Sequence, residues 1–98
     1  MTTSAVQTRT STRHSIVASI GNTPLIELRH VTKGLPSGVR VFAKAEHLNP
    51  GGSVKDRPAL AMILEAERSG RLRSGKTILD ASSGNTGIAY GMIAAERG

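Results

Sequence analysis

The sequence predicts an α/β fold. Two short stretches, residues 24–29 and 39–46, alternate apolar and polar side chains, as half-buried strands do. Two longer stretches, residues 53–68 and 86–97, carry apolar residues at helical spacing. A short apolar run with β-branched residues at 77–82 predicts a third strand between the two helices. The order strand pair, helix, strand, helix is typical of the start of an open parallel sheet.

The first 14 residues differ in composition from the rest of the chain. We expect residues 1–14 to form a disordered tail, because half of them are Ser or Thr and none is acidic. An acid-free, Arg-bearing start is also found in transit peptides, and that alternative stays open. Residues 15–98 then form the folded part, beginning with a short helical turn at 15–20 that Ser15 caps and Gly21 ends.

The composition of the 98 residues excludes several classes of protein. The chain has no cysteine, which excludes a disulfide framework, a cysteine-based metal site and a cysteine nucleophile, and we expect no metal site. It has no apolar run of about 18 residues, which excludes a transmembrane helix, and we expect no membrane partner. We also expect a cytoplasmic location. The net charge of +6 suggests nucleic acid, but the basic residues are scattered and lack an aromatic stacking platform. We therefore expect no nucleic-acid partner.

One motif resembles a nucleotide-binding loop. Residues 70–77 (GRLRSGKT) match the pattern G-x-x-x-x-G-K-[ST], with Lys76 at the lysine position. That loop requires a strand before it and a helix after it, so that phosphate meets the helix N-terminus. Here a helix precedes the motif and the apolar run follows it. We interpret it as a basic loop between helix and strand, and nucleotide binding remains a remote alternative.

Two other turns carry residues suited to chemistry. Residues 49–57 (NPGGSVKDR) deliver Lys55 into the first turn of a helix, and an amine is the group that a Schiff-base nucleophile needs. Ser53 and Asp56 have the spacing of a capping box, with Asp in place of Glu. Residues 82–87 (SSGNTG) place hydroxyls and amides at a helix start, where a carboxylate or a phosphate binds. Taken singly, each turn is explained better by an ordinary structural role, namely a solvated surface lysine and a capped helix start.

Three motifs in one order and spacing make the chain similar to a known family. They are GNTPL at 21–25, KAEHLNPGGSVKDR at 44–57 and SGNTG at 83–87. Together they resemble the N-terminal part of the cysteine synthase and cystathionine β-synthase family. Its members are pyridoxal-phosphate enzymes of the tryptophan-synthase-β fold type, also called fold type II. The resemblance covers residues 15–98, which it identifies as the N-terminal part of the catalytic domain.

The resemblance implies roles for individual residues. Lys55 matches the lysine that holds pyridoxal 5′-phosphate, and Asn85 matches the asparagine that hydrogen-bonds the 3′ oxygen of the cofactor. One loop matches the segment that clasps the α-carboxylate of the amino-acid substrate: Ser82, Ser83, Gly84, Asn85 and Thr86. The family usually has Thr where this chain has Ser82, so the hydroxyl is kept and a methyl group is lost.

For function, the resemblance implies replacement of the β-substituent of an activated serine. The Asn85-Thr86 pair favours this branch over threonine dehydratases, which usually carry Asn-His there. We expect a cysteine synthase that converts O-acetylserine and sulfide to cysteine and acetate. The alternatives are cystathionine β-synthase and a non-catalytic truncated product.

Two parts of the family's site have no match in this chain. These are the glycine-rich loop for the cofactor phosphate and the residue that faces the pyridine nitrogen. We therefore expect the 98 residues to be a fragment that is inactive alone. The resemblance implies that the full-length enzyme is a homodimer.

Overall fold

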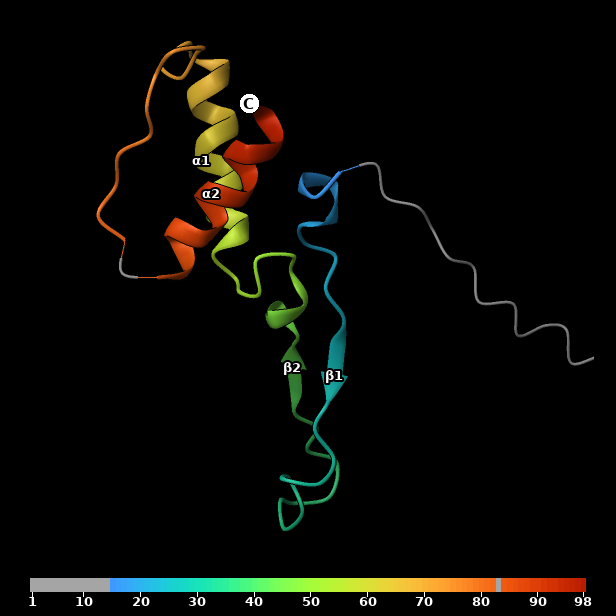
Figure 1. Ribbon diagram of the computed structural model, residues 1–98. Coiled ribbons are helices and arrows are strands. Elements are labelled where there is room, and N and C mark those ends of the chain that lie inside the picture. Colours follow the sequence, from blue (N-terminus) through green and yellow to red (C-terminus); the bar gives the residue numbers. More distant parts are fainter. Residues whose placement is uncertain (1–14, 83) are drawn as a thin grey trace, which may run out of the picture.

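The computed structural model describes residues 15–82 and 84–98 (Figure 1). The expected tail, residues 1–14, and Ser83 lie outside these residues. The elements in chain order are η1 (Val17–Ser19), β1 (Leu25–Glu27), β2 (Phe42–Lys44), η2 (Glu46–Leu48), α1 (Asp56–Arg68) and α2 (Asn85–Arg97). Helices α1 and α2 pack together, and the strand pair projects away from them (Figure 1). The α/β class expected from the sequence is confirmed.

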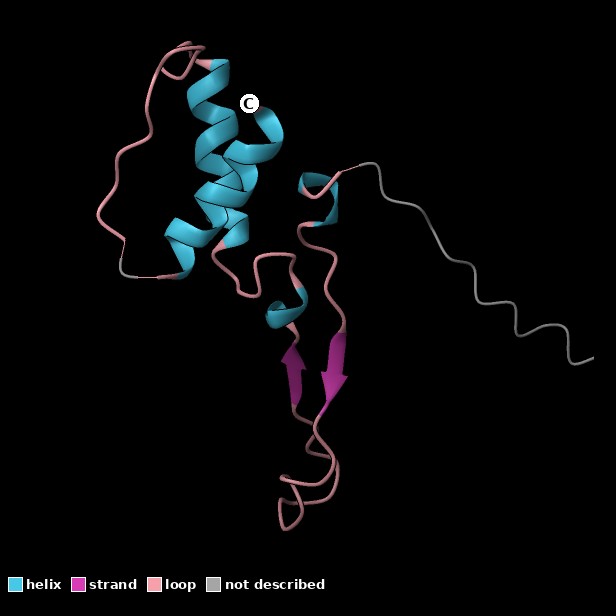
Figure 2. Cartoon of the chain, in the orientation of Figure 1, coloured by secondary structure: helices cyan, strands magenta, loops and turns pink. Residues whose placement is uncertain are grey.

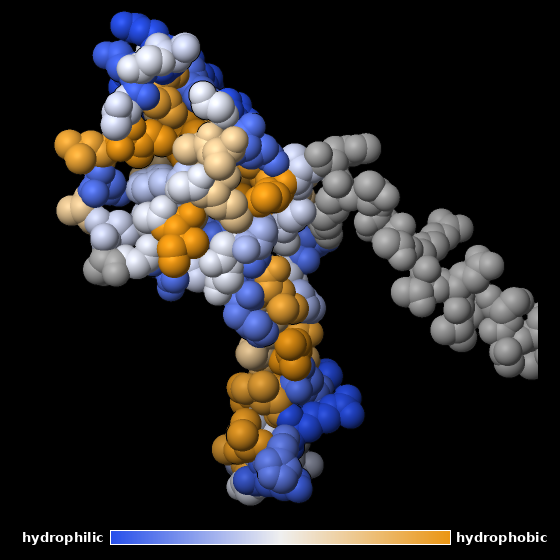
Figure 3. Space-filling view, in the orientation of Figure 1, coloured by the Kyte–Doolittle hydropathy of each residue, from blue (hydrophilic) through white to orange (hydrophobic). Residues whose placement is uncertain are grey.

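The two predicted strands at 24–29 and 39–46 form, with shorter bounds than expected. β1 and β2 pair antiparallel, with Ile26 opposite Ala43. Their side chains are more exposed than the alternating pattern suggested: Leu25 and Ile26, on opposite faces, are 62% and 43% exposed. A two-stranded sheet has no second layer of its own to cover either face. The projecting pair therefore shows apolar side chains along its surface (Figure 3).

The core lies between the two helices. Four side chains at helical spacing are buried there, namely Ala59 and Ile63 from α1 and Ala89 and Ile93 from α2. Two alanines at the contact let the helix backbones approach closely, and the isoleucines fill the space beside them. Ile88, which is also on α2, is 56% exposed. One stripe of α2, rather than its whole surface, faces α1.

Side chains near the C-terminus tie the start of the described chain to α2. The predicted helical turn at 15–20 forms as η1, but its N-cap residue is Ile16 and not Ser15. Ser15 Oγ, one residue earlier, accepts a hydrogen bond from Ala18 N at 2.9 Å. Glu96 Oε1 accepts a hydrogen bond from Ile16 N at 2.6 Å. The first and last described elements are thereby held side by side.

The prediction of a strand at 77–82 is wrong. These residues form no regular structure, and the loop between α1 and α2 runs out away from both helices before it returns (Figure 2). A strand exists only when a neighbour accepts and donates its backbone hydrogen bonds. The sheet that the described residues form has the order β1-β2, so 77–82 has no such neighbour there. The β-branched residues favour an extended backbone but do not supply the partner.

Candidate functional site

The two turns that the sequence singled out meet at one cavity of about 330 Å³. One wall comes from Lys55, the N-cap residue of α1. The other comes from the segment that leads into α2: Asp80, Ala81, Ser82, Gly84, Asn85 and Thr86. Residues far apart in the chain are therefore neighbours, because the packing of α1 on α2 brings the two segments together. Ser83, which was expected in the same loop, lies outside the described residues.

Lys55 is held at its backbone and open at its side chain. Its backbone N–H donates to Ser53 Oγ at 3.1 Å, and its carbonyl accepts from Ala59 N at 3.1 Å. The side chain is exposed. The expected capping box is wrong, because α1 begins at Asp56, whose carboxylate accepts from Gly51 N at 2.6 Å instead of reaching back to Ser53. The glycines at 51 and 52 fold the turn so that this amide faces the carboxylate.

Asn49 braces the turn that precedes Lys55. It is buried, and its side-chain oxygen accepts from Gly21 N at 2.7 Å. Its Nδ2 donates to the carbonyls of Glu46 at 2.9 Å and Ser53 at 3.1 Å. One side-chain amide therefore joins the first motif to the second.

Arg57, two residues after Lys55, forms a second brace with Glu46. Arg57 Nε lies 2.5 Å from Glu46 Oε1, and Arg57 NH2 lies 3.0 Å from Glu46 Oε2. The Thr23 hydroxyl donates to the same carboxylate. The hydrogen bond from Arg57, followed by that from Thr23, lowers the pKa of Glu46 from about 4.5 to about 2. This two-pronged pair connects the start of α1 to η2.

Acid should weaken this brace before it weakens the helix core. A carboxyl group whose pKa is lower in the folded state than in the unfolded state stabilises the folded state at pH values above the unfolded pKa, here near 4.5. That stabilisation is lost as the pH falls toward the folded-state pKa of about 2. We expect the thermal unfolding midpoint to fall across this interval, and to fall less steeply in Glu46→Gln. Glu65→Gln, which removes an exposed pair with Arg68, should keep the wild-type slope. Equal slopes in wild type and Glu46→Gln would contradict the assignment.

The start of α2 is organised by Ser82. Its Oγ accepts hydrogen bonds from Gly87 N at 2.8 Å and from Gly84 N at 3.4 Å. As an acceptor it keeps its hydroxyl hydrogen to donate to a ligand. The first amides of a helix have no partner inside it and lie at the positive end of its dipole. Together these donors suit a carboxylate placed in the cavity beside Lys55.

Asp80 is a cavity residue that sequence reasoning missed. It lines the cavity with Lys55, and its Oδ2 accepts from the Tyr90 hydroxyl at 2.9 Å. This hydrogen bond raises the pKa of Tyr90. The available signal was its place two residues before Ser82, at the end of the apolar run, but the run was interpreted as a strand.

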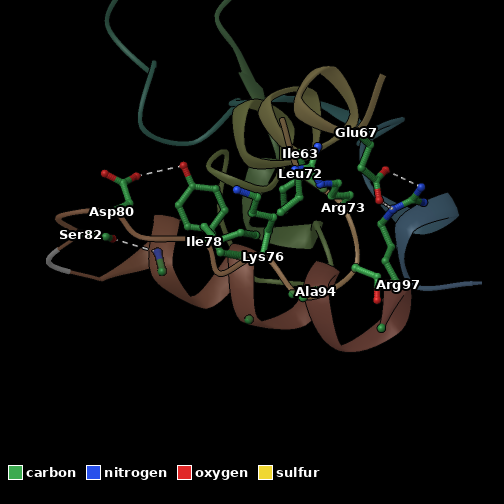
Figure 4. A pocket seen from close by; sticks show the side chains of 16 residues that line it. Ile63, Glu67, Leu72, Arg73, Lys76, Ile78, Asp80, Ser82, Ala94 and Arg97 are labelled. Carbon is green, nitrogen blue, oxygen red and sulfur yellow. Dashed lines mark hydrogen bonds and ion pairs between the residues drawn. The ribbon is translucent and has the colours of Figure 1, made fainter. Parts of the chain in front are cut away.

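A second cavity of about 640 Å³ lies between the helices and the 72–82 loop (Figure 4). Lys76 lines this cavity and does not line the one beside Lys55. α1 ends just before Gly70, and the next described helix begins only at Asn85. Residues 70–77 therefore follow a helix C-terminus and do not enter a helix, so they lack the geometry of a phosphate-binding loop.

Within residues 15–82 and 84–98, no helix has the length and apolar content needed to cross a membrane. In the same part of the chain, no group of three or more His, Asp or Glu side chains is placed to hold a metal ion.

Comparisons with known proteins agree on one family. The family described as "Pyridoxal-phosphate dependent enzyme" matches residues 16–98. A cysteine synthase of Aquifex aeolicus is 48% identical over 87 residues, which are 88% of this chain and 27% of that protein. A cystathionine beta-synthase of Apis mellifera is 52% identical over 83 residues, which are 85% of this chain and 16% of that protein.

Solved structures give the same result. The crystal structure of cysteine synthase from Entamoeba histolytica matches with a TM-score of 0.84 and 41% identity, over 91% of this chain and 27% of that one. An O-acetylserine dependent cystathionine beta-synthase from Helicobacter pylori matches with a TM-score of 0.81 and 37% identity, over 88% and 28%. The chain therefore spans between 16% and 28% of the length of these relatives.

Proposed function

Because the chain belongs to the pyridoxal-phosphate dependent enzyme family, we propose that it carries the cofactor lysine and the substrate-carboxylate loop of a β-replacing enzyme. The family match and the similar solved structures confirm the resemblance seen in the three motifs, at the level of the family and of fold type II. The roles of individual residues rest on one observation, which is that Lys55 and the loop before α2 line the same cavity.

The groups around this cavity fit the cofactor in kind. Lys55 brings a primary amine that can attach an aldehyde, and Asn85 brings a side-chain amide that can hydrogen-bond the ring oxygen. When bound, pyridoxal phosphate draws electrons from the substrate and so eases loss of its α-proton. In our proposal Lys55 Nζ holds the cofactor at rest, and once released it accepts that proton.

The loop before α2 orients the substrate. In our proposal the α-carboxylate lies against the hydroxyls of Ser82 and Thr86 and the first backbone amides of α2, with Ser83 completing the loop. Fixing the carboxylate at one end directs the α-carbon toward Lys55 at the other. The reacting groups are then already close and oriented, and this positioning accounts for a large part of the rate enhancement in such sites.

The reaction that we propose is synthesis of cysteine from O-acetylserine and sulfide, with acetate released. Relatives named cysteine synthase support it. Cystathionine beta-synthases of similar identity keep homocysteine as the second candidate acceptor. By the same resemblance we propose that the full-length protein is a cytoplasmic homodimer with small-molecule substrates.

Product analysis tests this proposal. The protein at its native length, supplied with pyridoxal phosphate, O-acetylserine and sulfide, should form cysteine, detected by mass spectrometry. Serine with homocysteine should react at least about tenfold more slowly, because an acceptor site discriminates by roughly a kilocalorie or more per unmatched group. The 98-residue chain alone should form neither product.

Two outcomes would redirect the proposal. If the native-length protein forms neither product, the chain is part of a non-catalytic product. Lys76→Ala serves as the control, since Lys76 lines the other cavity and its loss should leave cysteine formation unchanged. A loss of activity in that variant would indicate that residues 70–77 contribute to the site.

A further inference from the structure

Asp56, the residue after Lys55, has a fully buried carboxylate. Its Oδ2 accepts the Gly51 N–H at 2.6 Å. Its Oδ1 is also buried and has no hydrogen-bond partner among the described residues. An unpaired buried carboxylate oxygen is unfavourable, so its retention calls for a reason beyond ordinary packing.

The carboxylate is also fitted closely against Gly51. A Cβ added at Gly51 would overlap Asp56 Oδ1 and would lie 2.9 Å from its Cγ. Only a residue without a side chain leaves this space, which makes Gly51 and Asp56 a matched pair. The side chain of Asp56 thus fills the gap between the turn at 49–52 and the first turn of α1.

Lys55 depends on this gap being filled. Lys55 is the N-cap residue of α1, and its side chain makes no capping hydrogen bond. The direction of the Lys55 side chain is therefore set by the backbone on either side of it. Before it, Asn49 Nδ2 holds the Ser53 carbonyl at 3.1 Å, and after it, Arg57 holds Glu46. Asp56 adds a direct contact between these two halves, because its carboxylate reaches from the start of α1 to the Gly51 amide in the turn.

We propose that Asp56 is a positioning residue for Lys55, which it serves by locking the turn at 49–52 against the start of α1. The proposal rests on the assignment of Lys55 as the cofactor lysine. Asp56 does not touch the cavity itself. Its effect passes through the backbone, and a displacement of about 1 Å at a reacting group is enough to slow a reaction by up to about a hundredfold.

The test measures how fast Lys55 attaches pyridoxal phosphate in the native-length protein. The bound cofactor is trapped with borohydride at set times. Labelled Lys55 is then quantified by peptide mass spectrometry as a ratio to the unmodified peptide that contains Lys76. Asp56→Ala should lower this ratio at least about tenfold. Asp56→Asn keeps the shape and one acceptor for Gly51 N–H, and should remain within about threefold of wild type.

The matched pair allows a second, independent comparison. Gly51→Ala should also lower the ratio, since its Cβ displaces the carboxylate. In Gly51→Ala/Asp56→Ala the clash is gone, so the double variant should label no more slowly than Asp56→Ala alone. Gly91→Ala is the control, because a Cβ there meets open space on α2.

Every outcome decides for or against the positioning role. A wild-type ratio in Asp56→Ala, or equal loss in Asp56→Ala and Asp56→Asn, would overturn it. If Asp56→Ala does not fold by circular dichroism, Asp56→Ser takes its place, since Ser suits a helix start but is too short to reach Gly51. If neither folds, Asp56 serves stability alone. Absence of labelled Lys55 in the wild type would instead refute the cofactor role of Lys55.

Discussion

Replacing Lys55 with alanine should abolish the borohydride-stable adduct between the native-length protein and pyridoxal phosphate. A primary amine is the group that attaches the cofactor aldehyde, and in our proposal Lys55 supplies it to the cavity that Asn85 also lines. Reduction makes the link permanent, so intact-mass measurement should show one cofactor per chain in the wild type. The variant should show less than about a hundredth of that, as expected when a covalent catalyst is removed.

Two variants make this result specific. Lys55→Arg keeps the positive charge but presents a guanidinium that does not attach the aldehyde, so it should behave like Lys55→Ala. Lys76→Ala removes an exposed lysine from the other cavity and should label like the wild type. An adduct at full yield in Lys55→Ala would show that another lysine holds the cofactor.

Replacing Ile93 with alanine should produce the largest loss of stability among core substitutions. Ile93 is fully buried between α1 and α2, and with Ile63 it supplies the large side chains of a core otherwise made of alanine. The cavity left behind should lower the free energy of unfolding by about 2–5 kcal/mol. Denaturant titration, followed by the helix signal in circular dichroism at ~222 nm, measures the change in the free energy of unfolding.

Ile88→Ala is the matched control on the same helix. Ile88 is 56% exposed, so truncating it should change the free energy of unfolding by only about 0.5 kcal/mol. Equal losses in the two variants would mean that the contact between α1 and α2 is not the core. The comparison matters for the site, because this contact is what brings Lys55 and the segment before α2 to one cavity.

Local pattern predicted most of the elements. Alternation located β1 and β2, helical spacing located α1 and α2, and Gly21 marked the end of the first turn. These signals are local, because a side chain's period depends on backbone geometry within a few residues. The same kind of reasoning failed at 77–82, where an extended backbone needs a neighbouring strand that residue type does not supply.

The capping box failed for a related reason. Ser53 and Asp56 have suitable residue types and spacing, but the turn made by Gly51 and Gly52 offers Asp56 a different amide. Which donor lies nearer is decided by how the turn folds, and three-residue spacing carries no information about that. The brace between Arg57 and Glu46 was likewise invisible, because its partners are on different elements.

From the sequence alone came the family, the residue types of the site and the elements that carry them. The motifs alone identified Lys55 at one helix start and the segment of Ser82, Asn85 and Thr86 at another. They could do so because the chemical groups of a site depend on residue type. Only the tertiary structure decided that these two starts share a cavity, that Asp80 also lines it and that the Asp56 side chain is buried against Gly51. The reason is physical: distance between residues far apart in the chain is set by the packing of α1 on α2, which local pattern does not encode.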